Sequence, residues 1–314
     1  MDTAGRVVLP ALLCATALAT FLVLAAGVRI MAPPRGLQAP AAGPEEIRIR
    51  LFRVAGSAEL EQLFERHDYE LDAVRSGETP VPVLLAETLP RDLGTVPLRG
   101  GRKSLFLAAV LPSVLYCNEL VLVRRRRFEQ LWNEEATPAA TGAWVEVLAH
   151  RYGLEELAPE ELLRRVDTVP VSLALAQAAV ESGWGTSRFA RQGNALFGVR
   201  TWVMDEGLVP DDSGPGTTFG VRRYRTVTHS VCSYIHNLNV SDHYASFREA
   251  RQRLRRDGVA RQRWGHELAD HLQRYSEQGA RYTEVVRSVI SGNALDDFET
   301  VNLSGDPEQV AAGS

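Results

Sequence analysis

The sequence predicts a mainly α-helical protein with one small β-like part. From about residue 141 onward, apolar residues recur with the spacing of one helix after another. A further helical pattern covers 104–133, although Pro112 is expected to kink or interrupt it. The helical series pauses at 191–220, where six glycines and two prolines surround short strand-like pieces. This order of elements predicts a helical domain with one loop or hairpin excursion.

The individual helices are expected where apolar side chains repeat at helical spacing: around 144–148 and at 159–165, 170–182, 226–238, 244–256, 265–274 and 282–290. Strand-like segments are short: 47–51 ahead of the helices, and 197–200 and 219–224 in the pause. Strands are therefore few, and helices make up most of the predicted fold.

Composition excludes several classes of protein. The chain has 314 residues, a net charge of -4 and a pI near 6.0, whereas a dedicated nucleic-acid binder is usually strongly basic. Lys103 is the single lysine, so lysine-nucleophile and Schiff-base chemistry are nearly excluded. Three cysteines, Cys14, Cys117 and Cys232, are too few for a four-cysteine zinc site. Cys117 and Cys232 could pair in an oxidising compartment, and two buried free thiols are the alternative.

The amino-terminal segment has the composition of a membrane anchor. The 22 residues 7–28 carry no charged side chain. As a helix they would span about 33 Å, enough to cross a bilayer core of about 30 Å. A cleaved secretory signal is the alternative, but this run exceeds the apolar stretch of about 7–15 residues that is typical of a signal. We therefore expect a transmembrane anchor over 1–31.

Four further parts are expected after the anchor. Residues 32–44 are rich in proline, glycine and alanine and predict a linker. Residues 45–140 are expected to form a helical accessory region, and residues 141–298 the domain that carries the chemistry. Residues 299–314 are small and polar, and we expect a disordered tail.

The segment 170–185 contains the best candidate for a reactive side chain. Pro170 suits the first turn of a helix, and glycines at its other end suit its termination. Nearly every residue between is small or apolar, so the helix is expected to be buried on all sides. Gln177 and Glu181 are four apart and share one face. Burial raises the pKa of a carboxyl, as a general acid requires, unless an arginine such as Arg188 pairs with it.

Four short motifs follow one another along the chain: Glu181-Ser-Gly-Trp-Gly-Thr-Ser187, Asn194-Ala-Leu-Phe-Gly198, Tyr234-Ile-His-Asn-Leu-Asn239 and Tyr244-Ala-Ser-Phe-Arg248. In this order they resemble the glucosaminidase family of peptidoglycan hydrolases, glycoside hydrolase family seventy-three, and within it the Bax-like proteins. The resemblance covers 141–295, and 102–118 also resembles the helical region that precedes the domain in Bax-like proteins.

The resemblance implies a lysozyme-like α+β fold, mainly helical, with a cleft between a helical lobe and a small β-like lobe. It implies that the substrate is the aminosugar glycan strand of bacterial peptidoglycan, cleaved at the β-1,4 bond of N-acetylglucosamine. We expect no cofactor and no metal ion.

The resemblance also assigns roles to residues. Glu181 matches the general acid of the family, and Tyr244 matches a tyrosine near the cleaved sugar. The family often supplies a second carboxylate from the β-like lobe. The acidic candidates in that lobe are Asp205, Glu206, Asp211 and Asp212. We prefer Glu206 and then Asp205, and the acetamido oxygen of the substrate is the alternative to both.

Five residues are expected to bind substrate. Phe197 can stack on a sugar face, Asn194 can bond an acetamido or hydroxyl group, and Gly198 lets the backbone approach. Asp205 and Tyr234 complete the set. For Phe197, packing in the core is an equally good interpretation.

Other signals carry less weight. His229, His236 and His243 recur every seven residues, which places successive histidines about 10 Å apart on a helix. Ligands of one zinc ion lie about 2 Å from it, so we reject a metal site. The run 124–127 of four arginines is expected to be a solvated face or to attract anionic groups near a membrane.

Taken together, the sequence predicts a peptidoglycan hydrolase that is anchored in the inner membrane, with its catalytic domain in the periplasm. Secretion to the periplasm after signal cleavage is the alternative for its location. The alternatives for its function are a lytic transglycosylase and a non-catalytic glycan-binding or regulatory protein of the envelope. The expected partners are peptidoglycan glycan strands and, through the amino-terminal helix, the inner membrane.

Overall fold

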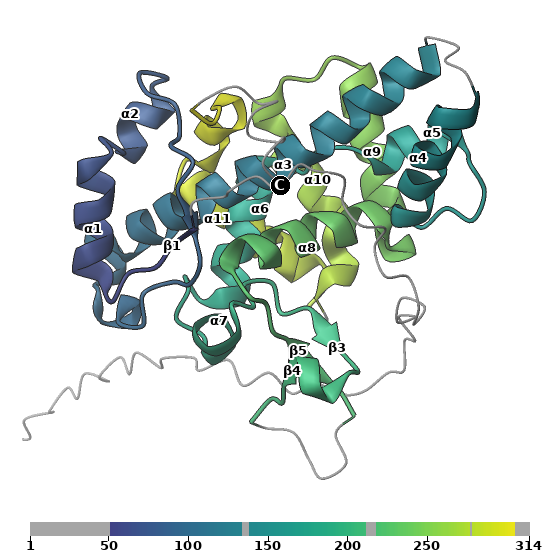
Figure 1. Ribbon diagram of the computed structural model, residues 1–314. Coiled ribbons are helices and arrows are strands. Elements are labelled where there is room, and N and C mark those ends of the chain that lie inside the picture. Colours follow the sequence, from purple (N-terminus) through teal and green to yellow (C-terminus); the bar gives the residue numbers. More distant parts are fainter. Residues whose placement is uncertain (1–50, 134–137, 212–217, 277, 305–314) are drawn as a thin grey trace, which may run out of the picture.

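The computed structural model describes residues 51–133, 138–211, 218–276 and 278–304. These residues are mostly helical (Figure 1), which confirms the predicted mainly α class. The predicted membrane anchor and linker lie outside the described residues, as do residues 305–314 of the predicted tail and all but the last residue of the predicted strand 47–51. The first part of the predicted tail, 299–304, is ordered: Glu299 is buried, and the backbone of Asn302 and Ser304 hydrogen-bonds with Val81. The prediction of disorder from residue 299 is therefore wrong for these residues.

Within the described residues the α-helices are α1 (Ser57–Arg66), α2 (Leu71–Arg75), α3 (Lys103–Asn133), α4 (Pro138–Arg151), α5 (Pro159–Arg165), α6 (Val171–Ser182), α7 (Arg188–Gly193), α8 (Val227–Val240), α9 (Ala245–Arg256), α10 (Trp264–Ala269) and α11 (Ala280–Gly292). The strands are β1 (Leu51–Phe52), β2 (Leu85–Ala86), β3 (Arg200–Thr201), β4 (Gly207–Leu208) and β5 (Gly220–Arg222). Short helical turns η3 (Met204–Glu206), η4 (Asp242–Tyr244), η6 (Asp270–Tyr275) and η7 (Leu295–Thr300) connect some of them.

Helix α6 is the centre of the fold. It packs against α3, α10, α11 and η7 (Figure 1). Its side chains from Leu173 to Ala179 are fully buried, as the small and apolar composition of this segment predicts. Gly265 allows α10 to lie close to α6, because a Cβ at Gly265 would be 2.1 Å from Ser172 Oγ. The neighbours of α6 therefore enclose it on all sides.

Helix α3 confirms the helical pattern predicted over 104–133. It continues through Pro112, so of the two expected effects of this proline, a kink or an interruption, the interruption does not occur. Its first half is buried against α6 and α8. One hydrophobic core extends from Leu60 in α1 to Phe298 in η7. The sequence predicts that an accessory region ends at residue 140 and a separate domain begins at 141. In the structure, residues on both sides of this boundary share one core.

Among the described residues, α3 is the one helix that is long and apolar enough to cross a membrane. Its most apolar window has a mean hydropathy of 1.9, and 78% of that window is buried inside the protein. A helix that serves as the core of a globular domain has the same composition. Helix α3 is therefore only weak evidence that the protein associates with a membrane.

The loop excursion predicted at 191–220 contains a small antiparallel sheet with the strand order β3-β5-β4. Arg200 and Leu208 both pair with Val221 of the middle strand. Gly207 permits the tight pairing, since a Cβ there would lie 2.9 Å from Thr201 Cγ2. Figure 1 shows this sheet to one side of the helical body, next to α7.

A disulfide between Cys117 and Cys232 links α3 to α8, so the alternative of two free thiols is wrong for this structure. The two cysteines are 115 residues apart, and closing so long a loop restricts the unfolded chain strongly. We expect reduction, or the double substitution Cys117→Ala/Cys232→Ala, to lower the free energy of unfolding by about 2–4 kcal/mol. Urea unfolding with and without dithiothreitol measures this loss, and dithiothreitol should not affect the double variant. Equal stabilities of the oxidised and reduced wild type would contradict it.

Candidate active site

The end of α6 sets the position of the candidate acid. Gly183 follows the helix in a left-handed conformation with φ 58°, and Trp184 and Gly185 also have positive φ. The Ser182 hydroxyl accepts the Gly185 N–H at 2.8 Å and donates to the Ala178 carbonyl. A Cβ at Gly185 would lie within 3 Å of two leucine side chains, so only glycine fits. These groups end α6 at Ser182, one residue after Glu181, as the glycines in the sequence predict.

Glu181 lies at the boundary between the core and the surface. The residue is half-buried, and a Cβ at the exposed Gly198 would lie 3.9 Å from Glu181 Oε2. Because Gly198 has no side chain, this side of the carboxyl stays accessible. Burial raises the pKa of Glu181 to about 7, and a hydrogen bond from Tyr282 opposes the rise only in part. The carboxyl is therefore about half protonated near neutral pH.

The arginine that we considered as a partner of Glu181 pairs elsewhere. The Arg188 guanidinium contacts the Asp211 carboxylate at 3.0 Å and donates to the Val209 carbonyl. It also covers the Phe189 ring, 4.7 Å from its centroid. No arginine or lysine among the described residues acts on the pKa of Glu181. The interpretation of Glu181 as one half of a buried ion pair is wrong.

Four buried tyrosines surround the Glu181 carboxyl: Tyr234, Tyr244, Tyr275 and Tyr282. Burial raises the pKa of each phenol, to about 12 for Tyr244, so all four are neutral at physiological pH. Tyr244 comes from η4, and Asn237 of α8 opposes the rise of its pKa in part. The structure thus brings Tyr244 close to Glu181, together with three tyrosines from other elements.

Two hydrogen bonds connect buried polar side chains close to Glu181. The Tyr234 hydroxyl donates to Gln177 Oε1 at 2.5 Å, and Gln177 Nε2 donates to the Tyr282 hydroxyl at 2.7 Å. Tyr282 also lies next to the Glu181 carboxyl and opposes the rise of its pKa. Gln177 and Tyr234 are fully buried, so bulk water does not reach them. The helical spacing places Gln177 beside Glu181, but Tyr282 lies about a hundred residues away, and its importance has no signal in the sequence pattern.

Stacked aromatic rings hold these hydroxyl groups in place. The Phe197 and Tyr234 rings stack with centroids 3.9 Å apart and an interplanar angle of 6°. The Tyr275 and Tyr282 rings stack at 5.6 Å and 5°. The Tyr275 hydroxyl joins the two pairs by donating to the Phe197 carbonyl at 3.0 Å. Stacking of this kind leaves little freedom for a ring to turn.

Three residues predicted to bind substrate are buried, which contradicts direct contact with a sugar. Phe197 is 2% exposed and Tyr234 is fully buried, because their rings stack on each other inside the core. Asn194 is 8% exposed, and its side-chain amide donates to the carbonyls of Tyr224 and Arg225. These side chains support the wall of the site, whereas the exposed Gly198 stays a candidate for approach by substrate.

The acidic residues of the small sheet have a different environment from Glu181. Asp205 and Glu206 lie in η3 and are exposed. Glu206 pairs with Arg222 at 3.0 Å across the sheet. Neither carboxylate contributes to the pKa of Glu181. Asp212 lies outside the described residues.

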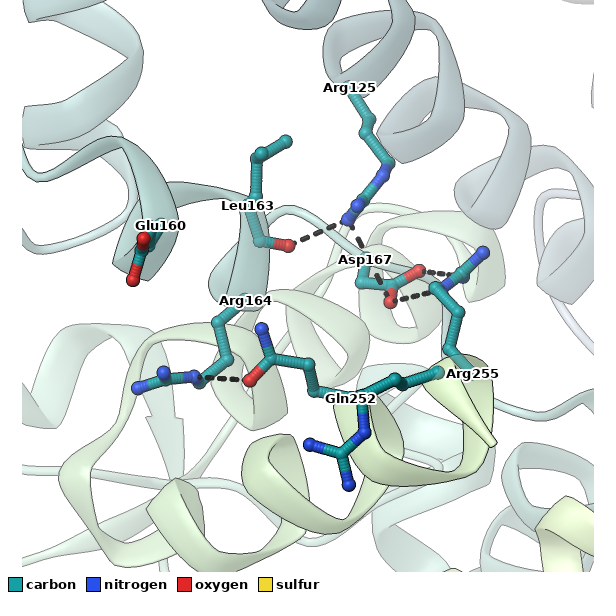
Figure 2. Close-up of a pocket in the computed structure, with 8 residues that line it drawn as sticks. Arg125, Glu160, Leu163, Arg164, Asp167, Gln252 and Arg255 are labelled. Atoms are coloured by element: carbon teal, nitrogen blue, oxygen red, sulfur yellow. Dashed lines mark hydrogen bonds and ion pairs between the residues drawn. The ribbon is translucent and has the colours of Figure 1, made fainter. Parts of the chain in front are cut away.

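Asp167 is a second buried carboxyl, and its arginine neighbours have the opposite effect on its pKa from that seen at Glu181. A hollow of about 230 Å³ between α3, α5 and α9 contains Asp167, which faces Arg125 and Arg255 (Figure 2). Burial alone would raise the pKa of Asp167, but the guanidinium groups of Arg251, Arg255 and Arg125 outweigh it and lower the pKa. Asp167 therefore stays ionised and joins helices together, whereas Glu181 can hold a proton.

Among the residues that the structure describes, no group of three His, Cys, Asp or Glu side chains is placed to hold a metal ion. Two of the histidines considered above have other surroundings: His229 hydrogen-bonds with Thr226 at the start of α8, and His236 packs edge-on against Tyr152.

Comparison with known proteins shows what the region around Glu181 is similar to. Residues 158–277 match the family model described as mannosyl-glycoprotein endo-beta-N-acetylglucosaminidase. The chain is 28% identical over 243 residues to "Protein bax" of Escherichia coli (strain K12), an alignment that covers 74% of this chain and 80% of the relative. No solved structure matches the chain significantly.

The raised pKa of Glu181 predicts a pH-dependent stability. The folded protein favours the protonated carboxyl, so this contribution is complete below pH 4.5 and is lost as the pH rises through about 7. Between pH 4.5 and about pH 7 we expect the free energy of unfolding of the wild type to fall by on the order of 1–3 kcal/mol relative to that of Glu181→Gln. This range allows for the partial exposure of the carboxyl. Urea unfolding of both proteins at pH 4.5 and pH 8 measures the difference. If the free energies of unfolding of the two proteins change equally between pH 4.5 and pH 8, the pKa of Glu181 is not raised.

Proposed function

This chain is a Bax-like protein with a glucosaminidase-family domain, and from that premise we propose that it cleaves the β-1,4 bonds of N-acetylglucosamine in peptidoglycan. The family supports a glycan-cleaving function related to the cell wall. The observation that carries the finer assignment is the Glu181 carboxyl, which is half-buried, has no cationic partner among the described residues, and has a pKa raised by burial to about 7.

In the proposed reaction Glu181 is the general acid. A glycosidic oxygen is a poor leaving group until it receives a proton, and a neutral carboxylic acid can supply one as the bond to the anomeric carbon breaks. An ordinary glutamate, with a pKa of 4.5, is almost fully ionised at pH 7. Burial without a cation keeps about half of the Glu181 carboxyl groups protonated at that pH, which supports this role.

Glu206 is the proposed second carboxylate. It is exposed and pairs with Arg222 at 3.0 Å. An ionised carboxylate can take a proton from the water that attacks the anomeric carbon, while Glu181 protonates the departing oxygen. Two carboxyl groups in such different environments could divide the roles of acid and base between them.

A lytic transglycosylase is the second candidate. It is favoured by the fact that no carboxylate among the described residues acts electrostatically on Glu181, as expected for a site that works with one carboxyl group. In that reaction an oxygen of the sugar itself replaces water and leaves 1,6-anhydro ends. Against it, the sequence reads Asn194-Ala-Leu-Phe-Gly198 where a Gly-Leu-Met-Gln type of segment is expected. Mass spectrometry of the products distinguishes the two reactions.

The disulfide supports a location outside the cytoplasm. Disulfides such as Cys117–Cys232 persist in oxidising compartments, and the bacterial periplasm is one of them. Peptidoglycan is accessible from the same compartment. We therefore propose that residues 1–31 anchor the chain in the inner membrane and that the glucosaminidase domain acts in the periplasm.

Substitution of the acid tests the proposed function. We expect Glu181→Gln to lower the rate of release of reducing ends from purified sacculi by at least about 10²-fold, because the amide has no proton to donate. The exposed Glu284 of α11 provides a matched control, and Glu284→Gln should retain the wild-type rate. If Glu181→Gln releases ends as fast as the wild type, Glu181 is not the acid.

A second pair of variants tests the role of Glu206. We expect Glu206→Gln to lose on the order of 10²-fold in kcat, whereas Glu267→Gln, at an exposed glutamate of α10 that also pairs with an arginine, should stay close to the wild type. The release of reducing ends from sacculi is again the measurement. Full activity of Glu206→Gln would favour an attack assisted by the acetamido group of the substrate.

A further inference from the structure

A hollow of about 290 Å³ lies where α2, the start of α3 and the residue after α11 meet. Its lining includes three cationic side chains, Arg75, Arg99 and Lys103, and none of the described residues that line it is acidic. We propose that this cationic hollow binds an acidic peptide, namely the peptide that the glycan strands of peptidoglycan carry. The choice of this peptide rests on the proposed function, whereas the binding itself needs no catalysis.

The neutral Asn293 holds two of the cations together. Its backbone carbonyl accepts from Arg75 Nη2 at 3.0 Å, and its side-chain oxygen accepts from Lys103 Nζ at 2.9 Å. Two like charges held near one another repel, and neither acceptor carries a charge that would offset the repulsion. Asp297 approaches Arg75 to 3.9 Å, but it does not line the hollow. The described residues that line the cationic hollow therefore leave its positive charge without a counter-charge.

Each of the three cations also has donors that the described residues do not use. Arg99 is exposed and forms no hydrogen bond or ion pair with a described residue. Lys103 uses one of its three ammonium hydrogens on Asn293. Arg75 Nε is buried and has no hydrogen-bond partner among the described residues. A carboxylate accepts several hydrogen bonds and carries a negative charge, so it satisfies both needs of the cationic hollow.

The lining of the cationic hollow suits a peptide with more than one carboxylate. The cations come from three elements: α2, the turn η2 (Leu98–Arg102) and α3. Separate carboxylates along one ligand can therefore each meet a cation. Leu98 and Leu107 also line the hollow and offer apolar surface to short side chains such as that of alanine. Peptidoglycan consists of glycan strands joined to short peptides, and these peptides contain alanine and free carboxylates.

The cationic hollow lies beside the end of α6 that carries the candidate acid. Lys103 Nζ is 4.9 Å from the centroid of the Trp184 ring. Trp184 follows Glu181 by three residues, so the Cα atoms of these two residues are at most about 10 Å apart. A glycan strand cleaved at Glu181 therefore brings its peptides within reach of Lys103. By binding them, the cationic hollow makes the protein prefer strands with peptides over bare strands.

Lys103 provides a direct readout of binding, because it is the single lysine of the chain. Reductive methylation with ¹³C-formaldehyde labels its ammonium group and keeps the positive charge, and the label at the amino terminus gives a separate signal. The probe is the peptide Ala-Glu-Ala with a free carboxyl end, added to the full-length protein in a neutral detergent. We expect the Lys103 methyl signal to shift with added peptide, and sodium chloride to weaken the binding.

Matched peptides and variants define the binding result. Ala-Gln-Ala amide has the same size without carboxylates and should leave the Lys103 signal unchanged. We expect Arg99→Gln to weaken the binding of Ala-Glu-Ala by about threefold, the size of one exposed ion pair. Arg253→Gln, at an exposed arginine of α9 away from α2 (Figure 1), should bind like the wild type.

Two outcomes of the titrations overturn the proposal. The first is an equal response to the two peptides, whether both shift the Lys103 signal or neither does. The second concerns inorganic phosphate, which is titrated separately: if it binds more tightly than Ala-Glu-Ala, the cationic hollow is a phosphate site and not a peptide site.

The effect on catalysis is measured as a split between KM and kcat. On sacculi we expect Arg99→Gln to raise the apparent KM by about threefold and to leave kcat unchanged. On glycan from which an amidase has removed the peptides, both values should equal those of the wild type. The same change in KM on both substrates, or no change on either, overturns the role in substrate preference. If the peptide shifts the Lys103 signal and Glu181→Gln keeps full activity, the cationic hollow is supported and only Glu181 as the acid is overturned.

Discussion

The burial of one carboxyl without a cation is the constraint on which the candidate site depends. Glu181 ends a helix whose other faces are enclosed by the core, and its polar neighbours are phenols rather than arginines. Asp167 shows the alternative within the same protein, because three guanidinium groups lower its pKa. Burial disfavours the ionised form of both carboxyl groups, and the sign of the pKa shift is decided by whether a positive charge lies beside them. One is a structural ion pair and the other can hold a proton.

Tyrosine suits the surroundings of such an acid. A buried phenol remains neutral, so it can hydrogen-bond and pack without the charge that would hold the carboxyl ionised. The stacked pairs around Tyr234 and Tyr275 keep the hydroxyl groups at fixed positions, and Gln177 connects two of them across the face of α6. A third buried carboxyl, Glu299, accepts hydrogen bonds from Ser172 at the start of the same helix. Helix α6 is thus held by polar contacts at both ends and by apolar packing between them.

The parts of the site that are local in sequence could be predicted. The small and apolar run that precedes Glu181 predicts a buried helix, and the glycines after it predict its end; both are confirmed. The helical repeat places Gln177 on the same face. Residues whose roles depend on packing could not be predicted in this way. An aromatic side chain such as Phe197 can cover a sugar or fill a core, and the pattern of the sequence is the same in both cases. Its 2% exposure decides for the core.

The sequence by itself determined the mainly helical class, the pause that contains the small sheet, and the position of the acid at the end of a buried helix. These features depend on residue type and on spacing within one segment, which backbone geometry converts directly into structure. The tertiary structure alone decided that Arg188 turns away to Asp211, that Cys117 pairs with Cys232, and that Tyr282 meets Glu181. These partners are separated by between 23 and 115 residues in the chain. The packing of α8 on α3, and of α3 and α11 on α6, brings the distant partners together, and local periodicity contains no information about it.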